Sequence, residues 1–92
     1  MTTIEKELVN NLYKMLEKRT NKSKDILDIL DVLVQVNKKL DKEKTPAVLI
    51  NKLNQYIRIT ASTGKIHFSN EEEELRAPLK TYEKRYNRLK IS

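Results

Sequence analysis

The stretch Ile26-Leu27-Asp28-Ile29-Leu30-Asp31-Val32-Leu33-Val34-Gln35-Val36 decides the fold class of this 92-residue chain. Eight of its eleven residues are apolar, and many are β-branched, which would suit a buried strand. The polar residues in and around it recur every three or four positions, at Asp25, Asp28, Asp31, Gln35 and Lys38. That spacing marks one face of a helix. The stretch therefore predicts a helix over residues 23–40, covered on all sides except one narrow polar strip and the most buried helix of the molecule.

An amphipathic helix is expected before this stretch, over residues 3–19. Its apolar residues are spaced by four, at Ile4, Leu8, Leu12 and Leu16. Lys18 and Arg19 fall in its last turn, where a cation meets the negative end of the helix dipole. Polar residues 20–23 end it.

A third helix is expected over residues 46–62. Thr45 should cap it and Pro46 should take the first helical position, where the missing N–H costs nothing. Its apolar stripe consists of Val48, Leu49, Leu53, Tyr56, Ile57 and Ala61. Gly64 is available as the left-handed residue that stops the helix.

A β-hairpin is the competing interpretation of this region, because apolar residues alternate over 57–61 and again over 66–68. An isolated two-stranded hairpin is marginal in water, however, and the helical stripe is unbroken to Ala61. The helix is therefore favoured, and we expect Ile66 and Phe68 to plug one end of the molecule from a loop.

A fourth helix is expected over residues 70–90. Ser69 and Glu72 form a capping box at its start. A single apolar seam then steps by four and three, through Leu75, Leu79, Tyr82, Tyr86 and Leu89. Pro78 lies within it and removes a backbone hydrogen bond to Glu74, so the helix should kink there and leave a semi-independent carboxyl-terminal arm.

Four amphipathic helices joined by short connectors pack most simply as an all-α, antiparallel, up-down-up-down four-helix bundle. We expect one domain over residues 1–92 with a kinked fourth helix. No repeat and no linker long enough to divide the chain is evident.

The sequence carries no recognisable catalytic or metal-binding set. It has no cysteine, one histidine and one glycine, which removes thiol chemistry and glycine-rich phosphate loops. His67 has no serine and carboxylate at triad spacing and no partner ligands for a metal. We therefore expect no enzyme activity, no metal and no cofactor.

Most of the excess positive charge lies toward the carboxyl end of the chain. The net charge is +6, and after Leu75 there are six basic residues against one acid, Glu83. Tyrosine beside arginine is typical of binding hot spots, so the candidate partner-binding residues are Tyr82, Lys84, Arg85, Tyr86, Arg88 and Lys90. A solvated helix face that complements the dipole would have the same composition, and both interpretations stay open.

A small basic helical nucleic-acid-binding protein, or a regulatory protein, is the alternative function. An isoelectric point near 9.6 supports it. A helix-turn-helix usually has a tight glycine-containing turn before its recognition helix, and none is evident.

The start of the chain lacks the basic and apolar regions of a signal peptide, and no apolar run approaches the ~20 residues that span a bilayer. The expected location is the cytoplasm.

Taken together, these features resemble the immunity proteins against pediocin-like (class IIa) bacteriocins, of the enterocin A immunity type. The resemblance covers nearly the whole chain. It depends on size, basic charge, the four-helix layout, residues 45–53 followed by Tyr56-Ile57, the loop Ile66-His67-Phe68-Ser69, and the basic end with Tyr82 and Tyr86.

The resemblance implies self-protection without destruction of the toxin. In this family the toxin attacks through the mannose phosphotransferase permease, and the immunity protein, here expected as a monomer, engages the permease with its bound bacteriocin at the inner face of the membrane. The carboxyl half, which here includes the arm, is where members select the toxin. Pro78 is a departure from the family pattern that leaves the direction of the arm open.

Overall fold

The computed structural model describes the backbone of residues 3–91 and the side chains of residues 4–82. Four helices follow one another, with no strand in this part of the chain: α1 (Thr3–Glu17), α2 (Lys24–Leu40), α3 (Pro46–Thr63) and α4 (Asn70–Ile91). Residues 57–61 are part of α3, so the prediction of a helix here, and not a β-hairpin, is confirmed. Every expected helix boundary lies within two residues of the observed one.

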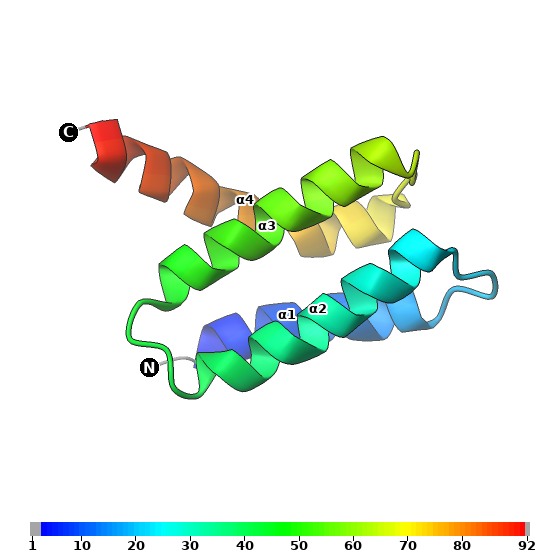
Figure 1. Ribbon diagram of the computed structural model, residues 1–92, viewed down its shortest axis with the longest axis horizontal. Helices are drawn as coiled ribbons and strands as arrows, with labels where there is room; N and C mark the ends of the chain where they lie inside the picture. The colour runs from blue at the N-terminus through cyan, green and yellow to red at the C-terminus, as the bar shows by residue number, and fades with distance from the viewer. Residues whose placement is uncertain (1–2, 92) are drawn as a thin grey trace.

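The helices form an antiparallel bundle (Figure 1). Both α1 and α3 pack against α2 and α4, so the four helices close into a ring. The connectors are only five or six residues long, which makes consecutive helices antiparallel neighbours. The predicted fold class is therefore confirmed.

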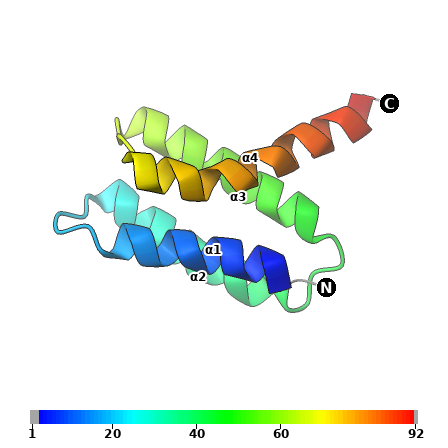
Figure 2. The same ribbon diagram turned by 180° about the vertical axis from the view of Figure 1, so that it is seen from behind.

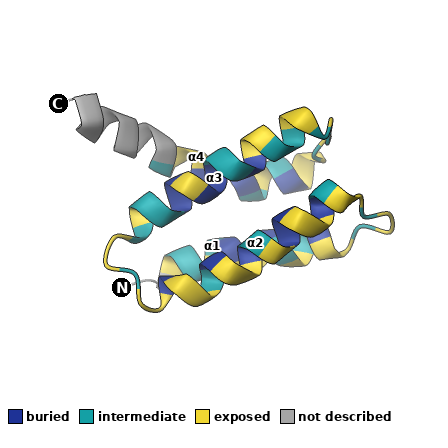
Figure 3. Cartoon of the chain, viewed as in Figure 1, coloured by how far each residue is buried: buried dark blue, intermediate teal, exposed yellow. Residues whose placement is uncertain are grey.

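The core is dominated by α2. Six of the thirteen buried hydrophobic residues in the described part of the chain lie on it: Ile26, Ile29, Leu30, Leu33, Val36 and Leu40. The expectation that α2 is covered on all sides but one narrow strip is wrong, because Leu27 is 53% exposed and Val34 37% exposed. Each helix of a four-helix ring packs against two neighbours, so α2 keeps an outer face that is exposed. Along the helix, these exposed residues alternate with the buried residues of the inner face (Figure 3).

The starts of α2 and α3 are capped differently. The Ser23 hydroxyl accepts a hydrogen bond from the backbone N–H of Ile26 at 3.3 Å, an ordinary side-chain cap. Thr45 precedes α3 but its side chain caps nothing. Its hydroxyl donates instead to the Glu43 carboxylate at 3.1 Å, which corrects the prediction of a threonine cap.

The end of α3 also departs from the prediction by one residue. Gly64 has an ordinary φ of −88°, and the left-handed residue is Lys65, with φ 54°. The Ile66 N–H donates to the Ala61 carbonyl at 2.9 Å, as in a Schellman motif whose left-handed position is Lys65. Ile66 and Phe68, which follow, pack against the core as expected of plugging residues.

Within α4, Pro78 interrupts the backbone hydrogen bonding but not the helix. The helix bends along its length, and its last part runs away from the other three helices in both views (Figures 1 and 2). No helix in the described part of the chain is long and apolar enough to cross a membrane.

Candidate functional site

The candidate site is α4, because the predicted partner-binding residues lie on its second half. The first half of α4 belongs to the bundle and determines where the second half starts.

The start of α4 is fixed by the capping box that the sequence predicts. The Glu72 N–H donates to the Ser69 hydroxyl at 3.2 Å, and the Ser69 N–H donates to Glu72 Oε1 at 2.8 Å. These reciprocal bonds satisfy two backbone donors that a helix start leaves free.

Arg19, just after α1, binds the same carboxylate. Its Nε donates to Glu72 Oε2 at 2.8 Å and its Nη2 to Oε1 at 2.6 Å. Nη2 also donates to the His67 carbonyl at 3.0 Å, so one guanidinium holds the loop before α4 as well as α4 itself. The Glu72 side chain is only 5% exposed and that of Arg19 is 25% exposed.

This pairing shifts the acid–base properties of both groups. The hydrogen bond from Arg19, with help from the backbone N–H of Ser69, lowers the pKa of Glu72 below its ordinary value although burial opposes the change. The hydrogen bond to Glu72 raises the pKa of Arg19. Both groups are therefore charged near neutral pH. The members of this pair are 53 positions apart, so no local pattern in the sequence predicts it.

Two cations that the sequence assigns to the basic tail are paired within the bundle. Arg76, 7% exposed, donates to Glu73 Oε1 at 2.8 Å, and Lys80 lies 3.3 Å from Glu73 Oε2. The guanidinium of Arg76 also stacks over the Phe68 ring at 4.7 Å from its centroid. Arg76 therefore helps to hold the loop before α4, and it is not available at the surface to a partner.

Tyr82 is the one predicted partner-binding residue whose side chain the structure describes. Its ring is half-buried against the core, and its hydroxyl donates to Glu5 Oε2 on α1 at 2.8 Å. Leu79, one turn earlier, is fully buried. Tyr82 therefore closes the contact between α4 and α1 at the base of the arm.

The other predicted residues lie on the part of α4 that runs away from the bundle. The backbone there is helical to Ile91 (Figure 2). The side chains lie outside the described residues, namely those of Lys84, Arg85, Tyr86, Arg88 and Lys90. Over the described range 4–82, no three acidic or histidine side chains gather closely enough to hold a metal ion.

Comparisons with a family model and with individual proteins agree on one family. A family model described as the bacteriocin immunity protein family matches residues 4–84. The chain is 51% identical over 70 residues to a probable mesentericin-Y105 immunity protein of Leuconostoc mesenteroides, covering 76% of this chain and 61% of the relative. It is 53% identical over 64 residues to a probable leucocin-A immunity protein of Leuconostoc gelidum, covering 70% of this chain and 56% of the relative.

The chain thus spans about three fifths of the length of these two relatives. No solved structure matches it. The matched family region includes residues of all four helices, with α4 matched as far as residue 84.

Proposed function

The chain belongs to the bacteriocin immunity protein family, and from this premise we propose that it protects the cell that makes it against a pediocin-like bacteriocin. Two similar proteins, each at least 51% identical over the matched region, are described as probable immunity proteins for mesentericin-Y105 and leucocin-A. These two toxins are therefore the first against which protection should be measured.

The proposed mechanism is occupancy from the cytosolic side. The protein binds the complex of the bacteriocin with the mannose phosphotransferase permease and blocks the pore, without cleaving or modifying the toxin. The arm of α4 makes the contact, through Tyr86 and the cations Lys84, Arg85, Arg88 and Lys90. Charged and aromatic side chains of this kind are enriched in binding hot spots.

One observation carries this assignment to the arm. The first half of α4 is tied to α1 and to the loop before it by Arg19, Glu72 and Tyr82, whereas the second half runs away from the other helices (Figure 1). A helix fixed at its base and separated from the bundle beyond it is arranged for contact with another molecule.

The test is expression in a strain sensitive to leucocin A, with the minimal inhibitory concentration as the readout. We expect the wild-type chain to raise it, and Arg85→Ala/Tyr86→Ala/Arg88→Ala to lose the protection while the purified variant melts at the wild-type temperature. The matched control is Lys14→Ala/Lys52→Ala, which also removes two cations but from exposed positions on α1 and α3. It should protect fully.

Two outcomes would contradict the proposal. Equal protection by the wild type and the arm variant would remove the arm from the mechanism. Loss of toxin activity when toxin and protein are mixed without cells would replace occupancy by direct inactivation or sequestration of the toxin.

A further inference from the structure

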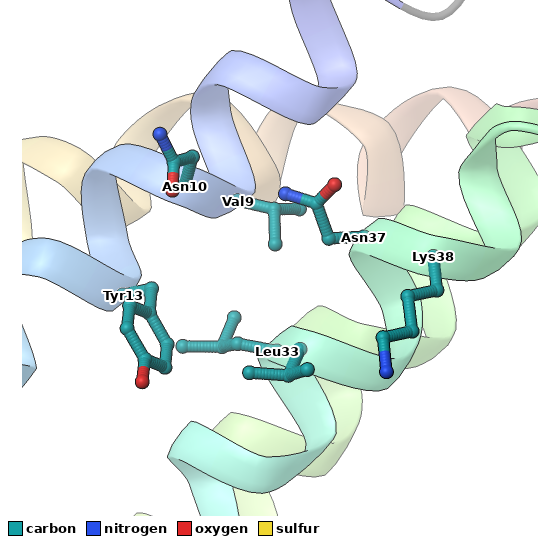
Figure 4. Close-up of a pocket in the computed structure, with 7 residues that line it drawn as sticks. Val9, Asn10, Tyr13, Leu33, Asn37 and Lys38 are labelled. Atoms are coloured by element: carbon teal, nitrogen blue, oxygen red, sulfur yellow. The ribbon is translucent and has the colours of Figure 1, made fainter.

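A solvent-open hollow of about 330 Å³ lies between α1 and α2, on elements that the proposed function does not use. Its lining comes from both helices: Val9, Asn10, Tyr13, Leu33, Val34, Asn37 and Lys38. Figure 4 shows Val9 and Tyr13 of α1 and Leu33 of α2 directed into the space between the helices.

The floor of the hollow is apolar, and a second exposed apolar side chain lies beyond it on α2. Val9 and Leu33 are buried beneath it, and Val34 at its edge is 37% exposed. Leu27, 53% exposed, precedes Val34 by seven residues, which is two helical turns or about 10.5 Å along the same face of α2. Leu27 and Val34 are thus two exposed apolar side chains on one face of α2, with the exposed Asp31 between them.

One end of the hollow carries a net positive charge, from three lysines against one glutamate. Lys38 lies at its rim and also lines a second hollow of about 400 Å³ with Lys39, Lys42 and Glu43. Within the described part of the chain, none of these three lysines forms an ion pair with a carboxylate. A third hollow adjoins through Asn10 and Asn37, but its Lys6 and Glu7 cancel in charge.

The opposite end of the groove carries acid instead. Asp31 lies between Leu27 and Val34 in the sequence and accepts a hydrogen bond from Gln35 at 2.8 Å. On α1, a hydrogen bond between Tyr13 and Glu17 raises the pKa of the tyrosine, so a carboxylate borders the ring at this end as well. The groove therefore has an apolar floor and oppositely charged ends, acidic toward Asp31 and basic toward Lys38.

We propose that this groove binds an acidic amphipathic helix of a partner protein. The groove between the neighbouring helices α1 and α2 has an apolar floor and can accept a third helix. Apolar residues seven positions apart on that helix would cover Val34 and Leu27. Carboxylates in the next turn would meet Lys38 and Lys42 and fix the orientation of the helix. A second copy of this chain fits less well, since each copy carries a net charge of +6 and the two would repel.

The test is an NMR titration of the intact protein with two synthetic peptides of about 16 residues, long enough to be helical when bound. Both carry leucines seven positions apart, and they differ only in having glutamates or lysines in the last turn. We expect the acidic peptide to bind at least about tenfold more tightly and to shift the backbone signals of Val9, Tyr13, Val34 and Lys38.

Variants make the test specific to the groove. Val34→Ser and Lys38→Glu alter exposed side chains, so the bundle should stay folded while affinity for the acidic peptide falls at least about fivefold. The matched control is Ile59→Ser, which removes an apolar side chain that is 59% exposed on α3, and affinity should not change.

Three outcomes would overturn the inference: equal binding of the two peptides, signal changes confined to residues outside the groove, or unchanged affinity in both groove variants. Concentration-dependent dimerisation that shifts the same signals without peptide would assign the groove to a second copy. Because the peptide assay needs neither toxin nor permease, its result is independent of the proposed immunity function.

Discussion

The guanidinium of Arg19 donates two hydrogen bonds, of 2.8 and 2.6 Å, to the carboxylate of Glu72, which lies 53 positions away in the sequence. The two donors are Nε and Nη2, so the pair has the two-point geometry that makes arginine–carboxylate contacts directional. The same carboxylate completes the capping box with Ser69. One side chain therefore both starts α4 and attaches it to the end of α1.

Replacing Arg19 by alanine should destabilise the bundle by about 2 to 3 kcal/mol, because it leaves a buried carboxylate without its charged partner. The value lies toward the low end for buried pairs because a quarter of the Arg19 side chain is exposed. Chemical denaturation followed by circular dichroism measures it. The comparison is Lys6→Ala, which breaks the exposed pair with Asp41 and should cost at most about 1 kcal/mol. Equal losses in the two variants would show that the Arg19–Glu72 pair behaves as an ordinary surface contact.

The depressed pKa of Glu72 predicts a loss of stability in acid. A carboxyl group whose folded pKa lies below its unfolded value stabilises the fold fully above the unfolded pKa, and that contribution disappears as the pH falls through the folded pKa. The ordinary value is 4.5. The difference in unfolding free energy between wild type and Glu72→Gln should therefore be constant near neutral pH and shrink below 4.5. A difference that stays constant down to the most acidic pH at which both proteins fold would mean that Glu72 is not selectively stabilised as the anion.

The start of α4 separates what the sequence can predict from what it cannot. The capping box is local, since Ser69 and Glu72 are three positions apart and their bonds follow from helix geometry. Arg19 is different, because the sequence places it as a cation in the last turn of a helix. In the structure α1 ends at Glu17, so Arg19 lies in the connector after the helix, and its side chain binds Glu72. Only the packing of α1 beside α4 makes that contact possible.

The end of α3 shows how one glycine can be misassigned. From the sequence, Gly64 is the expected left-handed residue because glycine takes positive φ without strain. In the structure Gly64 lies close to the start of α2 instead: a Cβ added to it would lie 2.3 Å from Asp25 Oδ2. The left-handed position passes to Lys65. A requirement for close approach to another helix leaves no local signal in the sequence.

Lys65→Gly should therefore stabilise the protein, by about 0.5 to 1 kcal/mol, because it relieves a left-handed backbone at a residue with a Cβ. Gly64→Ala should destabilise it, since the Asp25 carboxylate must move and the Thr60 carbonyl lies only 3.1 Å from the added carbon. Thermal melts of the two variants beside wild type test both signs. Stabilisation by Gly64→Ala would show that the Asp25 carboxylate moves aside without cost and that this close approach does not require glycine.

The base of the arm was partly predictable. The heptad-like seam placed Leu79 and Tyr82 on one face of α4, and both do pack on the core. The polar partner of Tyr82 on α1 was not predictable, because Glu5 lies 77 positions away in the sequence. Nor did the apolar stripes reveal that Asn51 and Asn54 of α3 are buried, at 2% and 1% exposure. Burial of polar side chains depends on tertiary packing, which periodicity alone does not encode.

The contact between Tyr82 and Glu5 predicts strong coupling between the two residues. Tyr82→Phe should cost about 1 to 2 kcal/mol, because it leaves the acceptor Oε2 unpaired beside Oε1, which is buried without a partner. Tyr82→Phe combined with Glu5→Met removes both polar partners and should recover most of that loss. A double-mutant cycle by denaturation measures the coupling. Additive losses would show that the hydroxyl contributes little to attaching the arm.

Pro78→Ala should redirect the arm and separate its direction from its composition. Alanine restores an N–H for the Glu74 carbonyl and removes the ring that pushes against it, so α4 should straighten and the bundle should gain up to about 3 kcal/mol. All the cations and tyrosines of the arm remain. If protection depends on where the arm points, the variant should be at least as stable as wild type and yet protect less in the leucocin A assay. Residual dipolar couplings across residues 70–91 measure the change in helix direction.

The control is Thr81→Ala, which removes the hydroxyl that donates to the Pro78 carbonyl at 2.6 Å but keeps the proline. It should protect almost as well as wild type. Full protection by a straightened Pro78→Ala variant would mean that the side chains of the arm suffice and that the bend has no part in the function.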